Sequence, residues 1–219
     1  MLRAILAGLA LRYRPEQVVF YLVDYRMRVL RPFQTLPHTR CFAADKDELV
    51  AMIDELDRLF KDRKAAIMEL HPVDAQIVLA ISNWDMLDAD ARNLDRLARW
   101  MVQAQELGIH LLITSSDFSQ AASSSLLKIV RMERSSVILG NADVSPTSLG
   151  LSKIPKLPPT MDAVPGRGFI VEGGRERLVQ FWHVPDALLD RLPFLSCPDR
   201  LPSLSGQAQH DGTVPGYPG

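Results

Sequence analysis

Three polar side chains follow a buried-type apolar run and could take part in phosphate chemistry. The run Ile77–Ile81 is continuous, and Ser82, Asn83 and Asp85 come soon after it. Such a run is typical of a strand buried on both faces of a parallel sheet. Open α/β sheets bind ligands at the carboxyl ends of their strands, where a nucleotide-hydrolysing motor holds magnesium with a carboxylate. We therefore take this stretch as the first candidate site.

The same side chains also have a structural interpretation. Asn and Asp readily form hydrogen bonds with nearby backbone groups, so Asn83 and Asp85 could simply cap the loop between strand and helix. Asp24 follows a second apolar strand, Val18–Val23. It could face a nucleotide or a neighbouring subunit, or form a solvated pair with Arg26. The residues alone leave these alternatives open.

The bulk composition is that of an ordinary globular protein. The chain has 219 residues, 47% hydrophobic and 23% charged, with a formal net charge of −1, enough for one sizeable core. The near-neutral balance gives no overall field that would attract nucleic acid. Cys41 and Cys197 lie far apart without metal-ligand spacing, which favours a reduced, cytosolic compartment. No apolar run approaches the roughly 20 residues that span a bilayer.

Periodicity places strands and helices in alternation. Asp45 and Glu48 have the spacing of a helix capping box, and Gly108 is typical of the position after a helix. The expected helices are Met1–Tyr13, the segment from Asp45 to about Met68, a segment beginning near Asp88 and ending at Gly108, Ser124–Met132 and Pro185–Leu192. The expected strands are Val18–Val23, Gln76–Ile81, Ile109–Ile113 and Ser136–Leu139, followed by a hairpin of Arg167–Val171 and Leu178–Trp182.

This alternation predicts an α/β fold, with a mostly parallel sheet covered by helices on both faces. The late hairpin would be an antiparallel appendage. Residues 1–193 are predicted to form one domain, with a loop from Asn141 to Pro165. Residues 194–219 are rich in Pro, Ser and Gly and are predicted to be a flexible tail.

Six motifs in this order resemble the ATPase module of the FtsK/SpoIIIE superfamily. They cover roughly Met1 to Val184 and are Leu2–Tyr13, Phe20–Arg26, Leu36-Pro37-His38, the strand ending at Asp85, Leu107–Ile113 and Pro165-Gly166-Arg167-Gly168. Within the superfamily the chain looks most like a terminal module of EccC, the multi-ATPase motor of type VII secretion, because Ser136–Asp143 is similar to the strand and turn of that branch. The resemblance implies a P-loop NTPase, RecA-like fold.

Two departures from the family pattern bear on mechanism. Family members carry a glycine-rich phosphate loop ending in Gly-Lys-Ser/Thr directly before the first helix. The sequence opens where that loop would have finished, so either it is a fragment or the protein has lost the loop. The family's acidic pair falls on Ser82 and Asn83, which carry no charge, and its later Gln falls on Ser116. Asp85 would then be the remaining acid.

The resemblance therefore implies a degenerate nucleotide-binding module in which hydrolysis is not expected. Its nucleotide-binding candidates are Ser82, Asn83, Asp85, Ser116 and Asp24. Candidates for a trans-acting arginine finger are Arg131 and Arg134, and no metal ligand is proposed. ATP and Mg²⁺ are expected as cofactors only if an upstream phosphate loop exists.

The expected partners are neighbouring ATPase modules or subunits and the helical tail of a secreted substrate, with no direct membrane insertion. The expected location is cytoplasmic, at the inner face of the membrane within a larger complex. One alternative is a DNA translocase motor domain truncated at its N-terminus, the only case in which DNA would be a partner. The other is a scaffold that never binds nucleotide.

Overall fold

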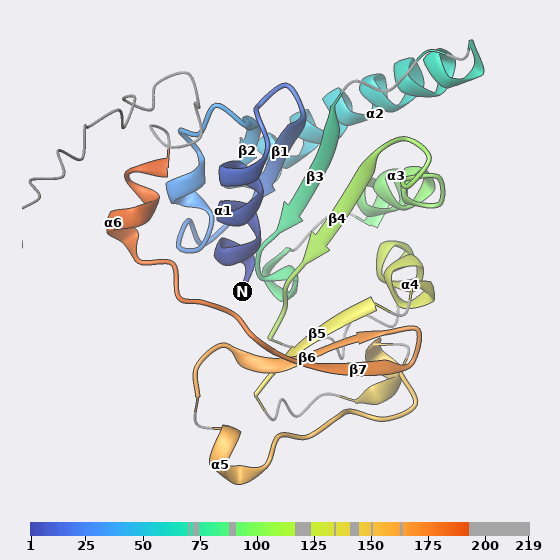
Figure 1. The fold of residues 1–219 in the computed structure, drawn as a ribbon. Coiled ribbons are helices and arrows are strands. Elements are labelled where there is room, and N and C mark those ends of the chain that lie inside the picture. The colour runs from blue at the N-terminus through green and yellow to red at the C-terminus, as the bar shows by residue number, and fades with distance from the viewer. Residues whose placement is uncertain are drawn as a thin grey trace, which may run out of the picture.

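A four-stranded parallel sheet with strand order β2-β1-β3-β4 forms the centre of the molecule in the computed structural model (Figure 1). The structure describes residues 1–69, 71, 75–87, 91–116, 124–133, 135–140, 145–149, 151–162 and 164–192. The strands are β1 (Val18–Val23), β2 (Thr39–Ala43), β3 (Gln76–Ile81) and β4 (Ile109–Ile113). The parallel sheet that the sequence predicted is confirmed.

Strand β2 is an addition to the predicted set. It pairs with β1 at the edge of the sheet, and a register irregularity lies between Phe20 and Tyr21 of β1. Its five residues include the exposed Arg40 and only one fully buried side chain, Ala43. A short edge strand of this kind lacks the continuous apolar run that identifies the central strands.

One face of the parallel sheet is covered by α1 (Leu2–Arg12), the 3-10 turn η1 (Arg31–Phe33) and the late helix α6 (Asp186–Leu189). Alternate residues of β1 point to this face, among them Phe20 and Leu22, while Tyr21 and Val23 point to the other. The alternation gives β1 two apolar faces, because side chains on a strand alternate in direction.

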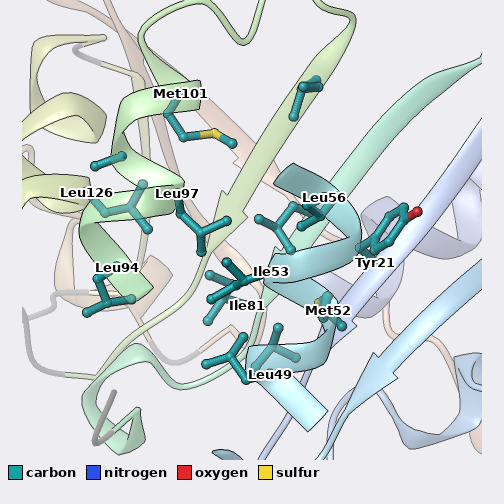
Figure 2. Packing of buried hydrophobic residues seen from close by; sticks show 14 of the residues in the cluster. Tyr21, Leu49, Met52, Ile53, Leu56, Ile81, Leu94, Leu97, Met101 and Leu126 are labelled. Carbon is teal, nitrogen blue, oxygen red and sulfur yellow. The ribbon is translucent and has the colours of Figure 1, made fainter. Parts of the chain in front are cut away.

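Helices α2 (Lys46–Met68), α3 (Ala91–Met101) and α4 (Ser125–Met132) cover the opposite face. Figure 2 shows residues of α2 such as Ile53 and Leu56 packed beside Ile81 of β3 and Leu97 of α3. The expected cap of α2 is confirmed. The Asp45 side chain accepts a hydrogen bond from the Glu48 N–H at 2.9 Å, and Glu48 Oε2 accepts one from the Ala44 N–H at 2.7 Å.

A second, antiparallel sheet has the order β5-β6-β7 and consists of β5 (Ser135–Leu139), β6 (Arg167–Glu172) and β7 (Arg175–Gln180). The hairpin is confirmed, with Gly173 and Gly174 at φ +55° and +81° in its two-residue turn. β5 pairs with this hairpin and not with the parallel sheet. Gly168 of β6 permits the close pairing, since a Cβ there would lie 2.0 Å from the Ile138 carbonyl oxygen.

The remaining predictions fall on connecting segments. The expected loop from Asn141 to Pro165 contains two short turns, η4 (Pro146–Leu149) and α5 (Pro159–Asp162). Asp88 and the predicted tail 194–219 lie outside the described residues. Within the described part of the chain, no helix combines the length and the apolarity needed to cross a membrane.

Candidate functional site

The candidate site lies where β1 and β3 end side by side. Val23 pairs with Ile81, so the next residues, Asp24 and Ser82, meet at the same edge of the sheet. The chain leaving β1 leads to η1 on the α1 face, whereas the chain leaving β3 leads to α3 on the opposite face. Neighbouring strands whose connections diverge in this way form the crevice in which open α/β sheets bind ligands.

Ser82 and Asn83 form local hydrogen bonds at the tip of β3. The Ser82 N–H donates to the Val23 carbonyl at 2.9 Å, and its side chain is almost fully buried. Asn83 adopts a left-handed backbone conformation with φ 55° and ψ 65°. Its Nδ2 donates to Ser82 Oγ at 3.3 Å, and its N–H donates to Thr114 Oγ1 at 3.2 Å. Asn83 stands at the start of the short turn Trp84–Met86 but forms no side-chain cap hydrogen bond there, so the loop capping expected of its side chain is not seen.

Asp85 is the exposed carboxylate of this edge. Its Oδ1 accepts a hydrogen bond from Ser115 Oγ at 2.9 Å, and its Oδ2 accepts one from Ser116 Oγ at 3.2 Å. Partial burial acts to raise the pKa of Asp85, but the hydrogen bonds from Ser115, from its own backbone and from Ser116 outweigh it and lower the pKa below its ordinary value. Asp85 is therefore negative at neutral pH and is held against the end of β4.

Asp24 points into its own loop. The residue is fully buried, and its Oδ2 accepts hydrogen bonds from the backbone N–H groups of Val29 at 2.8 Å and Leu30 at 2.7 Å. Its Oδ1 has no hydrogen-bond partner among the described residues. Arg3 of α1 fixes the same loop, because its guanidinium donates to the carbonyl oxygens of Arg28 and Val29. The geometry gives Asp24 a structural role in this loop.

The sequence-predicted residues thus fall into separate groups. Asp85 and Ser116 are in contact, as are Ser82 and Asn83, whereas the Asp24 carboxylate is directed elsewhere. Arg131 lies in the last turn of α4, and Arg134 lies outside the described residues.

The sequence patterns did not identify two further residues of this site. Thr114 and Ser115 bond to Asn83 and Asp85. They follow β4 as directly as Ser82 follows β3, so their place at a strand end was the signal that could have identified them.

The residues at this edge do not fit a catalytic magnesium site. Magnesium is held in phosphoryl-transfer sites by carboxylates and substrate phosphates. Here one carboxylate is buried in a loop, and the exposed one is occupied by two hydroxyl groups. Within the described ranges, no group of three His, Cys, Asp or Glu residues is placed to hold a metal ion.

One hollow of the described surface lies elsewhere, between α2 and the sheet. It has a volume of about 430 Å³, and its lining includes Val19, Tyr21, Glu55, Leu59 and Ile77. Tyr21 donates a hydrogen bond to Glu55 Oε1 at 2.9 Å. Burial, followed by this contact with Glu55, raises the pKa of Tyr21, so the phenol stays protonated. Glu55 also accepts a hydrogen bond from Arg40, and the hollow contains none of the candidate site residues.

The motif Leu36-Pro37-His38 has a packing role. His38 is almost fully buried, stacks on Phe20 with ring centroids 5.4 Å apart, and its Nε2 lies 2.8 Å from the Tyr13 carbonyl oxygen. The motif therefore joins the end of α1 to the starts of β1 and β2.

Comparison with known proteins matches these features to a family. A sequence model of the FtsK/SpoIIIE family matches residues 1–138. The ESX secretion system protein EccC of Thermomonospora curvata is 27% identical over 185 residues, which cover 78% of this chain and 13% of that protein. The chain therefore spans only a small part of the relative's length.

Solved structures show the same fold. A structure of ATPases 2 and 3 of T. curvata EccC in complex with a signal sequence peptide superposes with a TM-score of 0.67 at 21% identity, over 84% of this chain and 34% of that one. ATPases 2 and 3 of EssC from Geobacillus thermodenitrificans superpose with a TM-score of 0.67 at 20% identity, over 89% and 40% of the two chains. The fold is that of P-loop ATPase domains, and with the family model matching more than half of its residues, the chain belongs to the FtsK/SpoIIIE family.

Proposed function

We propose that this chain is a degenerate, non-hydrolysing ATPase module of a type VII secretion motor. The observation that carries the proposal is the pairing of Ser82 with Asn83 at the tip of the central strand. Neither side chain carries a charge that could hold a metal ion, and neither accepts a proton from an attacking water as a carboxylate does. Asp85, the exposed acid nearby, is engaged by Ser115 and Ser116.

The assignment to secretion rests on the relatives. Both the sequence relative and the superposed structures named above are EccC or EssC proteins. One of those structures is a complex with a signal sequence peptide. By analogy, we assign this chain a role in docking neighbouring ATPase modules and the helical tail of a secreted substrate, at the inner face of the membrane within a larger complex. An amphipathic tail of that kind would bind by laying its apolar face in a groove.

Nucleotide binding is a separate part of the proposal. Bound ATP would supply the phosphates that a glycine-rich loop cradles through its backbone N–H groups. The 219 residues contain no Gly-Lys-Ser/Thr sequence, so these residues alone predict weak binding or none. Calorimetric titration with a non-hydrolysable ATP analogue separates a weak nucleotide-binding module, which would give heat, from a scaffold, which would give none.

Phosphate release from ATP tests the loss of catalysis. We expect the purified protein to release phosphate no faster than a protein-free blank, with and without Mg²⁺, and Asp85→Ala to give the same result. A rate above the blank that falls in Asp85→Ala would refute the proposal, because that loss would make the exposed carboxylate a working catalytic group. Ser125→Ala, at the start of α4, is the control.

A further inference from the structure

The outer side of α1 is apolar, although a helix that covers a sheet usually presents a polar face to water. Its inner side packs in a core cluster with residues of β1 and η1. On the outer side, Gly8 and Leu11 are exposed, Leu11 to 45%, and Ile5 is half-buried. Ile5 packs in none of the hydrophobic clusters of the described residues. The charged residues of the helix are Arg3 and Arg12. A helix that is apolar on all sides is typical of a position that is covered on all sides.

Gly8 in the middle of α1 makes this observation sharper. Glycine is less favourable than alanine inside a helix, because it loses more backbone freedom on folding. A Cβ atom at Gly8 would meet no heavy atom within 4 Å, so the described residues give no packing reason for the glycine. Ile5, Gly8 and Leu11 follow one another at intervals of three and therefore lie along one side of the helix. These three residues form the outer strip of α1.

The last described helix brings the chain to the same face of the sheet. Arg3 Nη1 of α1 donates a hydrogen bond to Asp186 Oδ1 of α6 at 2.7 Å, and Figure 1 shows the two helices on one side of the sheet. Leu189 and Leu192 are almost fully buried in the core cluster that contains α1. Leu192 is the last described residue, and residues 193–219 follow it in the sequence. The chain therefore leaves the described structure close to the outer strip of α1.

The first part of the C-terminal segment has an apolar pattern of its own. Four apolar residues recur at every third position, Leu195, Pro198, Leu201 and Leu204. The prolines of this part disfavour a helix and favour the polyproline II conformation, which has three residues per turn. A spacing of three therefore places the four side chains on one side of such a segment. Residues 205–219 contain no leucine, isoleucine or phenylalanine, so the pattern ends at Leu204.

The lengths of the helix and of the patterned segment are compatible. α1 has 11 residues, and a helix of that length is about 16 Å long. A polyproline II segment rises about 3.1 Å per residue, so residues 193–204 reach about 37 Å. The segment is therefore long enough both to cross from Leu192 to α1 and to lie along the whole helix.

We propose that residues 193–204 form a C-terminal strap that packs in an extended conformation along the outer strip of α1 in the same molecule. The apolar side of the strap covers the apolar side of the helix, and removal of both surfaces from water supplies the driving force. The missing side chain of Gly8 lets the strap approach the helix closely. Because α6 tethers the strap beside α1, the contact forms within one molecule rather than between two. The flexible tail expected from composition is then limited to residues 205–219.

Urea denaturation of the 219-residue chain tests the strap. Leu201→Ser/Leu204→Ser should raise the unfolding equilibrium constant roughly tenfold, the effect expected from exposing one leucine side chain. Val214→Ser, which lies beyond the apolar pattern, is the matched control and should leave the constant unchanged. Leu11→Gln removes the partner on α1, so the strap substitution should lose most of its effect in that background. Equal effects in the two backgrounds, or no effect in either, would overturn the proposal.

Amide chemical shifts measured by NMR locate the contact. In Leu201→Ser/Leu204→Ser the signals of Ile5, Gly8 and Leu11 should move, whereas those of β7 in the second sheet should not. Unmoved signals in α1 would overturn the proposal. The shifts of the unchanged protein should be the same at low and high protein concentration, and a dependence on concentration would overturn the proposal by showing that the strap binds a second copy. No nucleotide is present in these experiments, so their outcome is independent of the ATP hydrolysis test.

Discussion

Two carboxylates stand at strand ends on the same edge of the sheet, and their surroundings give them different roles. Asp24 is fully buried and bonded to two backbone N–H groups of its own loop, whereas Asp85 is exposed and bonded mainly to hydroxyl groups. In sequence both are an acid following an apolar run. The difference shows that burial and the direction of the side chain, rather than position at a strand end, decide whether an acid organises the fold or meets a ligand.

Replacing the buried carboxylate should have the largest effect. Asp24→Ala leaves the N–H groups of Val29 and Leu30 without acceptors in a buried loop, which costs roughly 2–4 kcal/mol of unfolding free energy. Asp85→Ala should change it by less than about 0.5 kcal/mol, as is usual for exposed sites. Urea denaturation measures both. Equal losses in the two variants would abolish the distinction drawn between these acids.

His38, a buried base near the starts of β1 and β2, should make the stability of the protein depend on pH. Burial lowers the pKa of His38 below its ordinary value of 6.5, more than the Tyr13 carbonyl and Glu16 raise it. The unfolded chain therefore binds a proton more readily than the folded one. The neutral His38 therefore stabilises the folded protein above its ordinary pKa. This contribution is lost as the pH falls from about 6.5 toward the lower pKa of the folded state.

His38→Gln, which keeps a hydrogen-bond donor for the Tyr13 carbonyl, tests that pH dependence. Across this window the urea midpoint of the unchanged protein should fall more steeply than that of the variant. The variant should also lose roughly 1–2 kcal/mol at neutral pH from imperfect packing against Phe20. Parallel pH profiles for the two proteins would show that another group is responsible.

Glycine substitution at Met27, the strained residue of the loop that follows Asp24, should raise the stability of the protein. Met27→Gly relieves the cost of a positive φ but adds chain entropy to the unfolded state, so we expect a net gain of about 0.5 kcal/mol in unfolding free energy. Met27→Ala keeps the strain and is the control. A loss of stability in Met27→Gly would mean that this side chain contributes packing.

The smallest effect concerns the exposed acid. Ser115→Ala removes the shortest hydrogen bond to Asp85, so the pKa of Asp85 should rise from its lowered value toward the ordinary value of 3.8. Titration by NMR reads this directly, and Ser125→Ala is the control, since Ser125 is not among the groups that lower the pKa of Asp85. An unchanged pKa would assign the lowering to the Asp85 and Ser116 backbone groups and to the Ser116 hydroxyl.

The sequence predicted the central architecture because its signals are local. The apolar runs Val18–Val23, Gln76–Ile81 and Ile109–Ile113 end within the observed bounds, and the glycine pair 173–174 marks the hairpin turn. β2 was missed because edge strands need no apolar run. The pairing of β5 with the hairpin was not foreseen, since partners distant in sequence leave no trace in periodicity.

The site was predicted only in outline, because local sequence signals do not show which distant residues are in contact. Position after a strand located Ser82, Asn83 and Asp85 at the correct edge, because parallel strands end together. It could not show that Asn83 turns back on Ser82, or that Asp85 meets Ser115 and Ser116. The first contact depends on the φ of Asn83. The second depends on a loop that lies 30 residues further along the chain.

Arg63 connects α2 to the starts of two strands. Its guanidinium donates to the carbonyl oxygens of Ala75, Leu107 and Gly108, which lie just before β3 and β4. The helix runs on to Met68, which is 79% exposed. Because one side chain bonds to the backbone just before both β3 and β4, a displacement of this part of α2 would disturb the starts of the two strands together.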